Sequence, residues 1–123
     1  MDTVKVAIPA APQYVQVVRL IAAGLASRLG FTLDEIDDLK IGVDELAAYL
    51  TGTQGRDGRL DIVFGVAGQR ITIDGTAHLS AGDGVRTDLT DFSRMILDTV
   101  ADEASLTEDG GKPSFHLVKS RGS

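Results

Sequence analysis

The sequence predicts an α+β two-layer sandwich, in which a mostly antiparallel sheet is covered on one face by three helices. Apolar residues alternate with a period of two in five segments, which is the pattern of strands with one covered face. They recur every three or four residues in three other segments, which is the pattern of amphipathic helices. Short glycine-containing connections join strands as hairpins. The predicted order is β-α-α-β-β-α-β-β.

The first half of the chain supplies a strand and two helices. Alternation over residues 4–8 predicts the strand. Pro12 suits a first helical position and Gly30 a C-terminal cap, so a helix is predicted over residues 12–29. Thr32 and Glu35 have the spacing of a capping box and start the second helix. Phe31 and Ile36 fit the accompanying hydrophobic staple, and Gly52 is the predicted stop.

The second half supplies two hairpins with a helix between them. Alternation over 60–66 and at Ile71 and Ile73 predicts two strands joined by residues 67–69. The pattern then disappears, and a loop is predicted from Gly75 to Arg86. A third helix, capped by Thr87 or Thr90, is predicted from the apolar residues Leu89, Phe92, Ile96 and Val100. The turn at 109–112 joins the last two strands.

Composition limits the classes of function. A chain of 123 residues and 13.0 kDa is predicted to form one domain, residues 1–123. It has no Cys, which excludes thiolate metal sites and cysteine nucleophiles. A formal net charge of -6 repels a phosphate backbone, so direct nucleic-acid binding is not expected. No signal segment or long apolar run is visible, which predicts a cytoplasmic protein with no membrane contact.

The second helix has the highest density of acidic residues. A solvated helix face explains most of them, and the first four suit the helix dipole. Glu45 lies toward the C-terminal end, where the dipole does not favour a negative charge, and Tyr49 lies one turn later. Glu45 is therefore a candidate general base or a partner-binding group. His78 and His116 lack ligand spacing, so no metal site is predicted.

Three segments together resemble a known family. They are Val18-Arg19, the run Asp37-Asp38-Leu39-Lys40-Ile41-Gly42-Val43-Asp44-Glu45, and Val100-Ala101-Asp102-Glu103. They are similar to the anti-sigma regulatory factor (RsbW/SpoIIAB-like) branch of the GHKL, or Bergerat-fold, ATPases. The resemblance runs over about residues 4–119. It implies that fold, a homodimer, and partner switching between a sigma factor and a STAS-type anti-anti-sigma factor.

The resemblance also implies a nucleotide site, which is altered here. The family's second helix carries a Glu as catalytic base and, four residues later, an Asn as Mg²⁺ ligand. Glu45 matches the first, whereas Tyr49 replaces the second with a phenol, a poor ligand for Mg²⁺. Asp74 and Gly75 would match the first glycine box, in which the Asp contacts adenine, but the glycine spacing is missing. At the second glycine box, Asp91 would place a carboxylate near a phosphate.

These changes favour an anti-sigma-like regulator that acts by protein binding and keeps only a degenerate nucleotide site. The alternative is an active ATP-dependent protein serine kinase, with ATP and Mg²⁺ as cofactors, that phosphorylates its anti-anti-sigma partner. A third reading is that the fold serves a different protein interaction. The candidate contact surfaces are the first helix around Arg19 and the acidic second helix.

Overall fold

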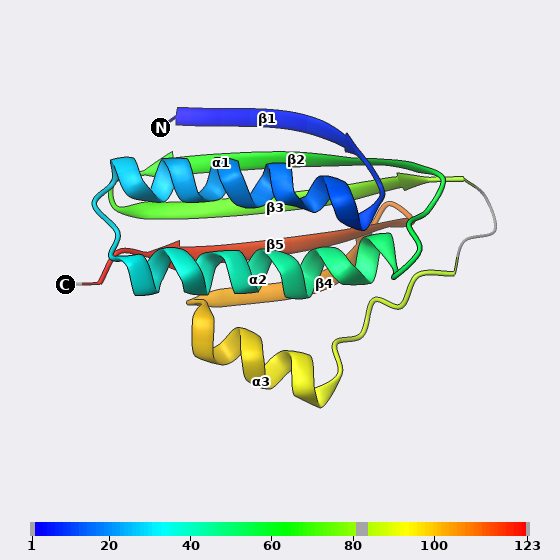
Figure 1. Ribbon diagram of the computed structural model, residues 1–123. Helices are drawn as coiled ribbons and strands as arrows, with labels where there is room; N and C mark the ends of the chain where they lie inside the picture. Colours follow the sequence, from blue (N-terminus) through cyan, green and yellow to red (C-terminus); the bar gives the residue numbers. More distant parts are fainter. Residues whose placement is uncertain (1, 81–83, 123) are drawn as a thin grey trace.

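The computed structural model describes residues 2–80 and 84–122, which form a five-stranded antiparallel sheet and three α-helices (Figure 1). In chain order the elements are β1 (Asp2–Pro9), the single 3₁₀ turn η1 (Pro12–Tyr14), α1 (Val15–Arg28), α2 (Leu33–Thr51), β2 (Gly58–Ala67), β3 (Arg70–Leu79), α3 (Asp91–Val100), β4 (Glu103–Asp109) and β5 (Lys112–Ser120). The strand order is β1-β2-β3-β5-β4. The predicted α+β class with an antiparallel sheet and three helices is confirmed.

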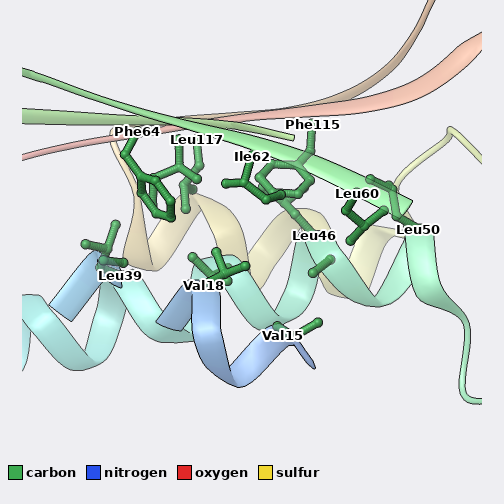
Figure 2. Close-up of a cluster of buried hydrophobic side chains, with 14 of the residues drawn as sticks. Val15, Val18, Leu39, Leu46, Leu50, Leu60, Ile62, Phe64, Phe115 and Leu117 are labelled. Atoms are coloured by element: carbon green, nitrogen blue, oxygen red, sulfur yellow. The ribbon is translucent and has the colours of Figure 1, made fainter. Parts of the chain in front are cut away.

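One face of the sheet and the inner faces of α1 and α2 enclose the core (Figure 2). The strands contribute Leu60, Ile62, Phe64, Phe115 and Leu117, and the helices contribute Val15, Val18, Leu39, Leu46 and Leu50. Burying one such side chain completely stabilises the fold by about 1.5–3 kcal/mol. This layer therefore supplies most of the hydrophobic stabilisation, and α3 packs at its margin, beside α2 and β4 (Figure 1).

The start and the end of α2 are as predicted. The Thr32 hydroxyl accepts a hydrogen bond from the Glu35 amide at 3.1 Å, and the Glu35 carboxylate accepts one from the Thr32 amide at 2.8 Å. This reciprocal pair satisfies two amides that the helix itself leaves without partners. Gly52 ends the helix with a φ of 64°, a conformation that favours glycine.

The loop predicted from Gly75 begins later, because β3 continues to Leu79. Gly75 occupies a strand position opposite Phe115, and a Cβ atom there would lie 2.4 Å from the Phe115 ring. Glycine is thus a packing requirement inside the strand, where the sequence pattern predicted the start of a loop. Gly82 and Asp83, which belong to the predicted loop, lie outside the described residues.

The third helix also differs from its prediction. It begins at Asp91, so Leu89 precedes it, and Thr90 is the cap. The buried side chains of α3 are Ser93, Leu97 and Val100. Phe92, predicted to belong to the buried stripe, is 66% exposed. The reason is that α3 turns Ser93 toward polar side chains of α2, which rotates the apolar Phe92 outward. Within the described ranges, no helix combines the length and apolarity that crossing a membrane would need.

Candidate functional site

A polar cluster joins the middle of α2 to the start of α3. We use the term for four residues: Glu45, Tyr49, Thr90 and Ser93. Glu45 and Tyr49 are one turn apart on α2 and therefore project to the same side. The four side chains and Ala48 line an open depression of about 360 Å³. The cluster contains the two α2 residues that the sequence singled out, and it lies where two elements distant in sequence meet.

The hydrogen bonds of the polar cluster run in one direction. The Thr90 amide donates to the Tyr49 hydroxyl at 3.1 Å, and that hydroxyl donates to Ser93 Oγ at 2.7 Å. Ser93 in turn donates to Glu45 Oε2 at 2.7 Å. Each hydroxyl thus uses its single proton, and the chain ends on a carboxylate, which makes its last bond the strongest kind. The three hydroxyl protons of the cluster and Glu45 Oε2 therefore all have partners inside it.

The Thr90 side chain satisfies one amide at the N-terminal end of α3. The Thr90 hydroxyl accepts a hydrogen bond from the Ser93 amide at 3.0 Å. Asp91 then places a negative charge in the first turn, where the helix dipole favours it. Helix N-termini commonly bind phosphate through free amides and a positive potential. Here the Thr90 cap occupies one of these amides, and the Asp91 carboxylate opposes the positive potential.

The C-terminal end of α3 is tied down by a buried lysine. Lys119 Nζ donates to the Val100 carbonyl oxygen at 2.8 Å and lies 3.7 Å from Asp38 Oδ2 on α2. Cations near a helix C-terminus interact favourably with its dipole. Because Ser93 contacts Glu45 and Lys119 links Val100 to Asp38, α3 runs antiparallel to α2 and is fastened at both ends.

Asp74 and Gly75 do not join the polar cluster. Successive side chains of a strand point to opposite faces of the sheet. Position 75 faces the helix layer, against Phe115. Asp74 therefore lies on the other face, where its carboxylate is 2.6 Å from Nδ1 of His116. The structure brings Glu45 and Tyr49 together and separates both from Asp74.

Arg19, the predicted contact residue of α1, bridges α1 and α2. Its Nε lies 3.4 Å from the Asp44 carboxylate, and its guanidinium also donates to the Gln16 side chain at 2.7 Å. Partial burial raises the pKa of Asp44 above its usual value, and Arg19 opposes that shift. Both side chains keep more than a third of their surface exposed, so the pair contributes little to stability.

Sequence reasoning did not assign Ser93, Thr90 or Lys119 to a site. A usable signal existed for the first two, because Thr followed by Ser three residues later is a cap pattern and Ser93 interrupts an apolar stripe. Lys119 gave a signal as well, since strand alternation puts it on the same face as the buried Phe115 and Leu117. Across residues 2–80 and 84–122, no group of three His, Asp or Glu side chains is arranged to hold a metal ion. His78 pairs instead with Asp61 at 2.9 Å.

Comparison with known proteins shows that the chain is similar to several proteins that carry the same name. Serine-protein kinase RsbW of Bacillus subtilis (strain 168) is 40% identical over 75 residues, 58% of this chain and 47% of that protein. RsbW of Bacillus pumilus (strain SAFR-032) is 38% identical over 78 residues, 59% and 48% of the two chains. RsbW of Bacillus cereus (strain ATCC 10987 / NRS 248) is 32% identical over 97 residues, 77% and 58%. The chain is a homologue of RsbW.

The similarity to RsbW has a limited extent. The chain spans about half the length of the curated RsbW relatives that it matches. No protein-family model matches the chain. All three relatives carry the name serine-protein kinase RsbW, and the predicted resemblance to RsbW-like proteins is thereby confirmed.

Proposed function

We propose that this RsbW-like chain is an anti-sigma-factor-like regulator of transcription that acts by binding other proteins and has a degenerate nucleotide site. Its proposed partners are a sigma factor and a STAS-type anti-anti-sigma factor that compete for it. The proposed assembly is a homodimer of single domains with the GHKL, or Bergerat, fold. The antiparallel sheet, with α1 and α2 on one face, is compatible with that fold.

The polar cluster is the observation that carries this proposal. A protein that uses ATP needs amides and cationic groups free to face the phosphates. In the cluster, the Ser93 amide is bonded to Thr90, the Thr90 amide to Tyr49, and the Glu45 carboxylate to Ser93. These groups are bonded to one another, so a nucleotide phosphate or metal ion that used them would have to displace these bonds.

The donor set of the cluster does not fit Mg²⁺ and a triphosphate. Mg²⁺ prefers carboxylate, carbonyl, phosphate and water oxygens in octahedral geometry, which the neutral phenol of Tyr49 does not match. The first turn of α3 carries Asp91, which would repel a phosphate. On the helix side of β3, positions 75 and 77 are Gly and Ala, so neither offers a carboxylate to an adenine amino group. The proposal therefore includes no phosphoryl-transfer step.

The second candidate is an ATP-dependent protein serine kinase, as the relatives' name suggests. One contact favours this candidate. Glu45 accepts a hydrogen bond from the hydroxyl of Ser93, and a general base would accept the same kind of bond from the hydroxyl of a substrate serine. The kinase requires transfer of the γ-phosphate of ATP to a STAS-type partner. Incubation with labelled ATP, Mg²⁺ and that partner tests it, and phosphoserine on the partner would establish the kinase.

The direct test of the leading proposal is complex formation with and without nucleotide. The sigma factors and STAS proteins of the source organism are titrated against this chain by biolayer interferometry, with Mg-ATP, with Mg-ADP and with neither. We expect one sigma factor to bind, with an affinity that changes less than about twofold between the three conditions, a difference below 0.5 kcal/mol. Binding that requires ATP would favour the kinase. Binding of no sigma factor and no STAS protein would favour a different protein partner.

A further inference from the structure

Helix α3 exposes two large apolar side chains that no element of the fold covers. Phe92 is 66% exposed and Met95 is 60% exposed. They are three residues apart and therefore neighbours on one side of the helix. Exposed apolar side chains that cluster within a polar surround are typical of binding surfaces, and aromatic residues and Met are enriched in them.

The orientation of α3 is fixed by its other contacts. Ser93 faces α2 through Glu45, and Arg94 donates to the Ala104 carbonyl oxygen of β4 at 3.0 Å. Phe92 and Met95 occupy the remaining arc, which points away from the sheet. On α2 the corresponding outward arc holds Asp34, Asp37 and Ile41, all of them exposed. The two helices lie side by side (Figure 1), so these two arcs are neighbours on the same side of the protein.

The two helices that form this surface carry the net charge of the protein. Helices α2 and α3 carry eight acidic and two basic side chains, a balance of -6 that equals the formal net charge of the whole chain. All other residues together are neutral. Moreover, both basic side chains lie near acids of their own helix, Lys40 at 4.0 Å from Asp37 and Arg94 at 3.5 Å from Asp98.

We propose that this surface docks a cationic amphipathic helix of a partner protein. We call it the acidic helix face and define it by its exposed members: Asp34, Asp37, Ile41, Asp91, Phe92, Met95 and Asp98. Apolar side chains of the partner, spaced one turn apart, pack on Phe92 and Met95, and its lysines or arginines meet the surrounding acids. Charge complementarity selects this occupant, because a second copy would oppose the same negative surface and a nucleic acid would be repelled.

The docking surface extends the proposed function without depending on the partner being a sigma factor. It also differs from the surface around Arg19, since α1 carries two basic and no acidic side chains. The exposed Leu20 of α1, at 61%, provides a matched control for Phe92 and Met95. Replacing any of these three side chains leaves the polar cluster and the core intact.

The test uses a labelled peptide as the probe. A helical peptide of about 18 residues, roughly five turns, carries Leu one turn apart and Lys elsewhere, and a scrambled peptide has the same composition without the stripe. Fluorescence anisotropy measures both against the full chain and against the variants Phe92→Ser/Met95→Ser and Leu20→Ser, whose folding is checked by circular dichroism. We expect the double substitution to weaken binding of the striped peptide at least about tenfold, or 1.4 kcal/mol, and Leu20→Ser to change it less than about twofold.

Three results would overturn the docking surface. They are equal binding of both peptides, unchanged affinity in the Phe92→Ser/Met95→Ser variant, and an equal loss in Leu20→Ser. A further variant, Asp91→Asn/Asp98→Asn, is expected to bind more weakly at low salt and to depend less on salt than the wild type. Failure of this peptide test leaves sigma-factor binding open through α1. If no sigma factor binds in the titration but the striped peptide still binds as expected, the proposed function is wrong and the docking surface stands.

Discussion

The two flanks of α2 are built from different chemistry. On the flank toward α1 and the sheet, Leu46 and Val43 are fully buried among apolar side chains. On the flank toward α3, Glu45 and Tyr49 meet Thr90 and Ser93 through hydrogen bonds. Apolar packing stabilises in proportion to buried area, whereas hydrogen bonds contribute little net energy and cost more when a partner is lost. The first flank therefore holds the fold, and the second determines what the site can accept.

Truncating the apolar flank is expected to have the largest effect. Leu46→Ala removes a side chain with 0% exposure and leaves a cavity, which costs about 2–5 kcal/mol. Leu33→Ala, at a position that is 81% exposed on the same helix, is the control and should change stability by less than about 0.5 kcal/mol. Urea unfolding followed by circular dichroism measures both. Equal losses in the two variants would contradict the division between the flanks.

Breaking the polar flank at its centre is expected to cost less. Ser93→Ala removes the group that bonds both Tyr49 and Glu45 and should destabilise the fold by about 1–3 kcal/mol. Thr99→Ala, on the exposed side of α3, is the matched control. A loss as small as that of Thr99→Ala would mean that the cluster is an ordinary solvated surface.

Coupling within the polar flank is the next effect in size. Tyr49→Phe deletes one hydroxyl and should cost about 0.5–1.5 kcal/mol. Combined with Ser93→Ala in a double-mutant cycle, it should show a coupling energy of at least about 0.5 kcal/mol, because the two side chains share one bond. Strict additivity of the two losses in urea unfolding would show that the 2.7 Å contact contributes nothing.

The smallest expected effect lies at the start of α2, away from both flanks. Hydrogen bonds from the Thr32 and Gly122 amides lower the pKa of Glu35 below its usual value. A lowered folded-state pKa contributes stability above the unfolded pKa, and that contribution is lost as the pH falls through the folded value. Glu35→Gln should therefore be less stable than wild type at neutral pH, with the difference vanishing in acid. Asp34→Asn controls for the helix dipole, and a difference that persists in acid would contradict this assignment.

Local signals in the sequence predicted local structure well. Thr32 and Glu35 are close in sequence, so their capping box could be recognised without knowledge of the fold. Gly75 misled because its function is to make room for Phe115, forty positions away, and no local pattern encodes that contact. The rotation of α3 was missed for the same reason, since Ser93 is buried only because Glu45 and Tyr49 lie opposite it.

The candidate site was predictable only in part. Glu45 and Tyr49 stand one turn apart on a helix, so their proximity follows from the helical repeat. Asp74 was grouped with them through the family resemblance, yet strand alternation places it beside His116 on the other side of the sheet. The face on which Asp74 lies depends on where β3 starts and on its register, and both depend on how β3 pairs with its neighbouring strands.

Titration of Mg-ATP into the purified full chain by isothermal calorimetry tests the central claim most directly. If the polar cluster closes the place where a nucleotide would sit, no saturable heat appears at nucleotide concentrations up to the millimolar range, which corresponds to about -4 kcal/mol. Saturable one-site binding with a micromolar dissociation constant, abolished when Mg²⁺ is chelated, would contradict the account. It would show that the hydrogen bonds among Glu45, Tyr49, Thr90 and Ser93 give way to a nucleotide.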